Sequence, residues 1–141
     1  MASLVKIDGV RDIQRNLCKA DSRIRKALER GVVKAGLYIQ RESQRIVPVD
    51  TGNLKASAFT RKIGSGVKFD VIVGYTASYA IYVHENIEEK NKGEPRPRRR
   101  GVDRGNFWDP PGRGQSKFLE TPAREGKRRL IQIVRKEAER L

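Results

Sequence analysis

The stretch Val47-Pro48-Val49-Asp50-Thr51-Gly52-Asn53-Leu54 separates two kinds of pattern in this chain of 141 residues. Before it, apolar residues recur every three or four positions, as on one face of a helix; after it, apolar and polar residues alternate, as in a strand. Pro48 cannot continue a helix, because its ring removes a backbone donor and clashes with the preceding turn. Asp50 is expected to cap the turn that follows. The order helix, turn, strands predicts a fold of the α+β class.

The residues before the turn predict two helices, a short one over residues 10–19 and a long one over residues 23–46. The pair Asp21-Ser22 between them is a typical helix N-cap. The predicted apolar stripe consists of Ile13, Leu17, Ala20, Ile24, Ala27, Leu28, Val32, Ala35, Ile39 and Ile46. The opposite face is basic and carries Arg15, Lys19, Arg23, Lys26, Arg30, Lys34 and Arg41.

Two glycines, Gly31 and Gly36, lie inside the longer helix. A glycine in a helix interior costs about 1 kcal/mol relative to alanine, and close approach of another backbone is the usual reason for keeping it. Such a helix would press against a sheet or against a sister subunit. Both glycines are therefore candidate subunit-interface residues.

The residues after the turn predict a hairpin. Residues 58–63 form the first predicted strand, the Gly64-Ser65-Gly66 sequence is a typical turn, and residues 67–73 alternate as in a half-buried second strand. A short helical segment is expected over residues 54–57, and a further short strand over residues 4–7.

Two more helices are predicted towards the C-terminus. Tyrosines at helical spacing indicate a short amphipathic helix between Thr76 and Asn86. Thr121 is expected to cap the last helix, with Pro122 in its first turn. We therefore expect a small, mostly antiparallel sheet packed by one long N-terminal helix and a C-terminal helix, in a single domain of residues 1–141.

Two further junctions follow the first in the chain. They are Val73-Gly74-Tyr75-Thr76-Ala77-Ser78-Tyr79-Ala80-Ile81-Tyr82-Val83-His84-Glu85 and Lys117-Phe118-Leu119-Glu120-Thr121-Pro122-Ala123. In this order, the three segments resemble the neck or tail-completion family of tailed bacteriophages, from about residue 7 to the C-terminus. Residues 88–115 have no clear counterpart, because the relatives usually have a shorter loop there. The tyrosines of the second junction are candidate interface residues: Tyr75, Tyr79 and Tyr82.

The resemblance implies a structural protein of the virion and not an enzyme. Members of the family form a ring, here expected to contain about six copies, and a closed ring needs two different faces on each subunit. The implied role is to join the head connector to the tail and to let DNA through. The implied partners are the head-closure or connector protein and the tail terminator or tail-tube protein, with assembly in the host cytoplasm.

The composition favours anionic partners. The net charge is +14, with 34% charged and 37% hydrophobic residues, and such a field attracts nucleic acid, acidic protein surfaces and anionic membranes. The excess charge could equally serve to solvate long helices. No apolar run reaches the roughly 20 residues of a membrane span, and a membrane is not among the predicted partners.

Residues 88–116 predict an extended basic arm inserted in the domain. The segment is rich in proline and glycine and has almost no apolar periodicity, and structureless loops of this length are usually functional or disordered. Phe107 and Trp108 lie inside it, and large aromatic residues are typical anchors of interfaces. The favoured interpretation is an arm that docks on a neighbouring subunit or ring; the alternative is a hairpin that folds Trp108 back on its own domain.

The arm also carries a cluster of arginines. They are Arg96, Arg98, Arg99, Arg100, Arg104 and Arg113. Guanidinium groups can contact phosphates without reading bases, or pair with an acidic neighbouring ring. The sequence leaves both partners open.

The residue types needed for catalysis are scarce. The chain has one histidine, His84, and one cysteine, Cys18, whereas nucleophilic catalysis needs a nucleophile, a base and an orienting group together. A zinc site needs three or four ligands at usable spacing. We therefore expect no catalytic residue, metal or cofactor, and no disulfide within the chain.

Two alternatives to the neck protein remain at this stage. One is the tail terminator, a related ring that caps the tail tube. The other belongs to a different class, a small basic protein that binds nucleic acid without sequence specificity and with a steep salt dependence.

Overall fold

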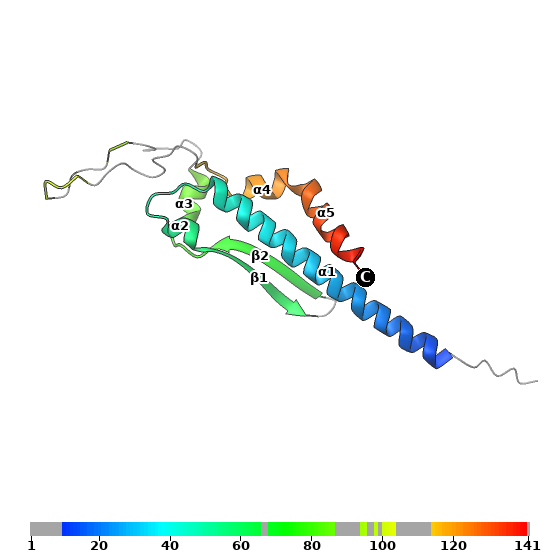
Figure 1. Ribbon diagram of the computed structural model, residues 1–141. Coiled ribbons are helices and arrows are strands. Elements are labelled where there is room, and N and C mark those ends of the chain that lie inside the picture. The colour runs from blue at the N-terminus through cyan, green and yellow to red at the C-terminus, as the bar shows by residue number, and fades with distance from the viewer. Residues whose placement is uncertain are drawn as a thin grey trace, which may run out of the picture.

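The computed structural model describes residues 10–65, 68–86, 94–95, 98, 100–103 and 114–140. Figure 1 shows the elements in chain order. They are α1 (Val10–Ile46), α2 (Asn53–Ala56), β1 (Ala58–Ser65), β2 (Lys68–Tyr75), α3 (Ala80–Glu85), α4 (Glu120–Glu125) and α5 (Lys127–Ala138). The predicted α+β class is confirmed. The strand expected over residues 4–7 lies outside the described residues.

The two helices predicted before the turn are one continuous helix, α1, so the predicted break at Asp21-Ser22 is wrong. Asp21 does not end a helix there; its carboxylate accepts a hydrogen bond from Arg25 Nε one turn later, at 3.2 Å. Pairs of this kind, four residues apart, stabilise a helix interior. A typical capping residue is therefore used here as half of an ion pair.

The turn after α1 forms as expected except for its cap. The residue at the N-cap of α2 is Gly52 and not Asp50, and it makes no side-chain cap hydrogen bond. Its φ of 83° lies in the left-handed region that glycine adopts without strain. The short helical segment itself is confirmed.

The hairpin is antiparallel, with Ala58 opposite Tyr75 and Thr60 opposite Val73. The first strand continues two residues beyond its predicted end, through Gly64 and Ser65. The following residues 66–67 lie outside the described part, so the predicted three-residue turn is described only for Gly64 and Ser65, which belong to β1.

One face of the hairpin packs against α1. Thr60 Oγ1 donates a hydrogen bond to Gln40 Oε1 at 2.6 Å, and Gln40 Nε2 donates to the Ala58 carbonyl at 3.4 Å. On the opposite side of α1 lie α4 and α5, so that α1 separates the hairpin from the C-terminal helices (Figure 1). The N-terminal part of α1 projects beyond both of these neighbours (Figure 1).

The predicted C-terminal helix is two helices, α4 and α5, which meet at Gly126. The N-cap of α4 is Leu119, so the predicted cap at Thr121 is wrong. A Cβ atom at Gly126 would lie close to the Pro122 carbonyl and 3.3 Å from Tyr38 Cε1. The turn at Gly126 therefore lies tightly against α1.

The helix predicted between Thr76 and Asn86 is shorter at its start, because α3 begins at Ala80. Before it, Thr76 N donates to the Ser57 carbonyl at 3.0 Å, and residues 78–79 form a turn. The core formed around α3 consists of Val47, Leu54 and Phe118, with Ile46, Tyr75, Ala77, Ala80, Val83 and Leu119 packed against it. This core lies at the end of α1 where the turn, α3 and the start of the C-terminal region meet.

Candidate functional site

The chain on the two sides of residues 87–113 is held together by a set of contacts that we call the clamp: His84, Glu85, Gln115 and Lys117. The backbone N of Lys117 donates to the His84 carbonyl at 2.8 Å, and that of Gln115 donates to the Ile46 carbonyl at 2.9 Å. Lys117 Nζ lies 2.5 Å from Glu85 Oε2. The clamp ties α3 and the end of α1 to the start of the C-terminal region.

The charges of the clamp favour its ionised form. The hydrogen bond from Lys117, followed by that from His84, holds the pKa of Glu85 below its ordinary value. The same contact with Glu85 raises the pKa of Lys117. His84 Nδ1 lies 2.8 Å from Glu85 Oε1, while His84 Nε2 is buried without a hydrogen-bond partner among the described residues.

Phe118 connects the clamp to the core. Its side chain is 1% exposed and meets the rings of Tyr75 and His84 edge to face, with centroids 5.1 and 5.0 Å apart. The Tyr75 hydroxyl is 2.7 Å from Ser43 Oγ of α1. Burial raises the pKa of Tyr75, and the hydrogen bond to Ser43 only partly offsets this effect.

Beside the clamp, apolar side chains face outward. Tyr79 is 40%, Ile81 65% and Tyr82 77% exposed, and we call these three residues the α3 surface. Asn53 Nδ2 donates to the Tyr79 hydroxyl at 3.3 Å, which anchors this end of the surface to α2. Exposed apolar groups gathered on one short helix are typical of an interaction surface.

The three tyrosines proposed for an interface thus have different environments. Tyr75 is half-buried and engaged with Ser43 and Phe118, whereas Tyr79 and Tyr82 are exposed. Sequence reasoning did not single out Ile81, although its place between two exposed tyrosines was a usable signal. The Glu85–Lys117 pair was also missed, because 32 residues separate its members.

Both candidate interface glycines are buried against elements of the same chain. A Cβ atom on Gly31 would lie 3.0 Å from Val134 Cα of α5, and one on Gly36 would lie 2.7 Å from Val71 Cγ1 of β2. The close packing that a helical glycine indicates is therefore provided on one side by α5 and on the other by the hairpin.

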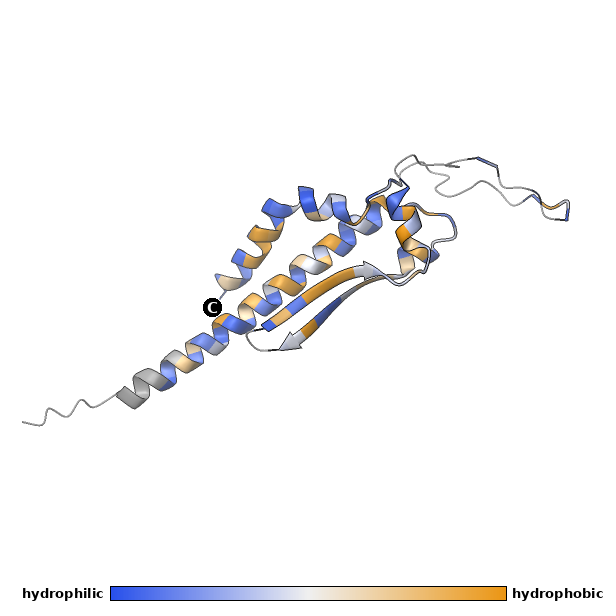
Figure 2. Cartoon of the chain, turned by 180° about the vertical axis from the view of Figure 1, so that it is seen from behind, coloured by the Kyte–Doolittle hydropathy of each residue, from blue (hydrophilic) through white to orange (hydrophobic). Residues whose placement is uncertain are grey.

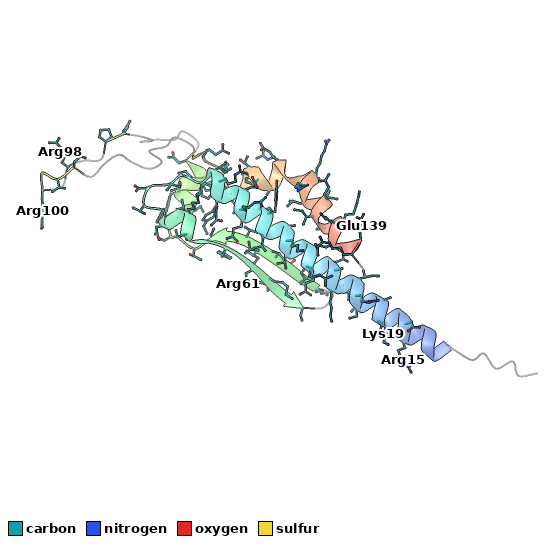
Figure 3. All side chains as sticks on the ribbon, viewed as in Figure 1. Arg15, Lys19, Arg61, Arg98, Arg100 and Glu139 are labelled. Atoms are coloured by element: carbon teal, nitrogen blue, oxygen red, sulfur yellow. The ribbon has the colours of Figure 1, made fainter. Side chains whose placement is uncertain are left out.

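The arm is described only in part. Arg98 and Arg100 are exposed and lie at the far end of the segment (Figure 3). Phe107, Trp108, Arg96, Arg99, Arg104 and Arg113 lie outside the described residues. The roles proposed for the aromatic pair and for the arginines stay predictions.

The described residues contain no group of three or more His, Cys, Asp and Glu side chains that could hold a metal ion. Cys18 is an exposed free thiol. Within the same part of the chain, no helix is both long and apolar enough to cross a membrane.

Comparison with known proteins identifies the family. Residues 11–85 match the family model described as "Bacteriophage HK97-gp10, putative tail-component", and this range is more than half of the 141 residues. The chain belongs to this phage tail-component family. It has no significant match among the curated proteins or among the solved structures.

The matched range covers nearly all of α1, the turn, the hairpin and α3, and it ends at the clamp. Two of the three motifs that suggested the resemblance therefore lie inside it, and the third, at residues 117–123, lies outside. Membership supports a structural role in the phage tail, a place in the virion and contacts with other virion proteins.

Proposed function

We propose that the protein is a neck, or tail-completion, component that joins the head connector to the tail. About six copies would form a closed ring around the path of the DNA. Each copy would be a single domain with an inserted arm at residues 88–116. Family membership supports the class of protein, and the α3 surface beside the clamp is the observation that carries the ring.

A closed ring needs two different, complementary faces on each subunit. The α3 surface is suited to be one of them, because Ile81 and Tyr82 expose apolar area that no described part of the chain covers. The second face would be the arm, whose Phe107 and Trp108 would anchor it on a sister subunit or an adjacent ring. The clamp would support both proposed ring contacts, because it fixes the chain next to the α3 surface and next to the start and end of the arm.

The test is complementation of a phage that lacks this gene, with particles counted by electron microscopy. A neck protein is expected to leave filled heads and finished tails that do not join. A tail terminator would instead leave tails of variable length, because nothing would cap the tube. That outcome would contradict the proposal in favour of the related ring.

Two isoleucine variants sharpen the test. Ile81 on the α3 surface is 65% exposed and Ile131 on α5 is 52% exposed, so serine at either position should leave folding unchanged. Ile81→Ser is expected to lower the yield of joined particles, whereas Ile131→Ser is not. Equal yields from both variants would show that the α3 surface takes no part in joining.

A further inference from the structure

One row of residues on α1 changes from small to basic side chains near the C-terminal end of α5. Taken at every fourth position, it reads Arg15, Lys19, Arg23, Ala27, Gly31, Ala35. Neighbours four apart are in contact, but such a row turns by about 40° around the helix at each step, so its two ends do not share a face. The C-terminal half of this row is small and buried, with Ala27 0% and Ala35 8% exposed. Small residues there let α5 approach closely, as Val134 does at Gly31.

The basic face of α1 shows how the fold neutralises positive charge under α5. Arg30 and Lys34 both direct their charges to Glu137, at 3.8 Å from Arg30 Nε and 2.6 Å from Lys34 Nζ. The Glu137 side chain is only 7% exposed, so α5 brings an anion to this face. The basic face of α1 is thus neutralised where the chain covers it.

No described residue continues this cover over the projecting part of α1, where Lys19, Arg23 and Lys26 are exposed. Figure 3 shows Arg15 and Lys19 on this projection, and Figure 2 colours much of it hydrophilic. An open groove there is lined by Arg15, Cys18, Lys19, Ser22 and Arg23. Basic side chains thus surround Cys18 and Ser22 on the projecting part of α1.

Like charges three and four residues apart on one helix repel one another. Lys19 and Arg23 are about 6 Å apart along the helix axis, because an α-helix rises about 1.5 Å per residue. A partner that supplies a regular row of negative charges would relieve the repulsion along this face.

We propose that the projecting part of α1, through Lys19, Arg23 and Lys26, binds the phosphate backbone of double-stranded DNA. Long, mobile cations are suited to phosphates, which they contact without reading bases. This binding does not depend on the neck assignment.

The experiment measures the affinity of the full-length protein for a duplex of arbitrary sequence by fluorescence anisotropy, between about 50 and 200 mM salt. Log affinity falls linearly with log salt, and each phosphate contact makes that slope steeper by about 0.9. The magnitude of this slope is called the salt slope below. The triple variant Lys19→Gln, Arg23→Gln, Lys26→Gln is expected to reduce the magnitude of the salt slope by about 2 to 3 units. Circular dichroism and a thermal melt establish that each variant is folded.

A matched control variant carries Lys127→Gln, Arg128→Gln and Lys136→Gln on α5. These three side chains are exposed, and their replacement removes the same amount of charge. The control variant is expected to keep the wild-type salt slope to within about one unit. The charge-conserving variant Lys19→Arg, Arg23→Lys, Lys26→Arg is expected to bind as the wild type does. If it did not, charge would not be the basis of binding and the proposal would fail.

Two other results would overturn the inference. Equal loss in the α1 and α5 variants would mean that only net charge attracts DNA. The second result comes from a binding measurement with polyglutamate, which serves as a probe for an acidic protein partner. If the α1 variant lost binding to polyglutamate while keeping the wild-type salt slope for DNA, the face would belong to a protein contact.

Discussion

Lys34 Nζ and Glu137 Oε1 lie 2.6 Å apart, although 103 residues separate them in the chain. Arg140 Nη1 approaches the same carboxylate at 3.0 Å. A nearly buried carboxylate that receives several cations fixes α5 on α1, because each group depends on the others for its solvation.

The first prediction concerns this carboxylate. Glu137→Gln should lower the melting temperature, because Lys34 and Arg30 would lose the anion that neutralises them. Lys34, ahead of the other cations, holds the pKa of Glu137 below its ordinary value. A carboxylate with a lowered folded-state pKa contributes stability above its unfolded pKa of about 4.3 and loses it as the pH falls further. Melts across this range should show a smaller acid destabilisation in the variant, and an identical profile would contradict the role of the pair.

The second prediction concerns Gly36 under the hairpin. In Gly36→Ala the new methyl group would meet Val71 Cγ1 at 2.7 Å and Thr60 Cγ2 at 3.0 Å. Overpacking of this kind costs about 1–3 kcal/mol, against a gain in helix propensity of about 1 kcal/mol. We expect net destabilisation in chemical denaturation. Lys26→Ala, exposed on the same helix, is the control and should be close to neutral.

The third prediction separates the core from the α3 surface. Phe118→Ala removes a ring that is 1% exposed and should cost about 3–5 kcal/mol. Tyr82→Ala removes a ring that is 77% exposed and should leave the free energy of unfolding nearly unchanged. A large loss in the Tyr82 variant would mean that this side chain stabilises its own domain.

The fourth prediction concerns the aromatic pair of the arm. If Trp108 anchors the arm on a neighbour, Trp108→Ala should leave the isolated protein's melting temperature nearly unchanged and reduce incorporation into particles. An intramolecular buried tryptophan would instead cost about 3–5 kcal/mol. A drop of many degrees for the isolated variant would favour the hairpin that folds back on its domain.

The fifth prediction concerns the arginine run. Replacing Arg98, Arg99 and Arg100 together with Gln should leave folding intact and lower the yield of joined particles. The defect should resemble that of the wild type at raised salt, because exposed charges are screened over about 8–10 Å near physiological ionic strength. A normal yield would mean that the run only solvates the surface.

Local patterns in the sequence determined the order of the elements. The turn after Val47, the alternating hairpin and the family resemblance depend on proline chemistry and on side-chain periodicity over neighbouring residues. The exposed tyrosines of the α3 surface could also be singled out from their spacing. The predicted helix boundaries were less accurate, since Asp21 and Thr121 are good caps in isolation but not in this fold.

The tertiary structure decided which residues these elements bring together. It turns Tyr75 inward to Ser43 and Phe118, and it seats Val134 of α5 on Gly31. It also buries Glu137 under the cations of α1, while Lys19, Arg23 and Lys26 of the same face are exposed among the described residues. None of this follows from periodicity, because burial and the loss of solvent depend on packing between segments far apart in the chain.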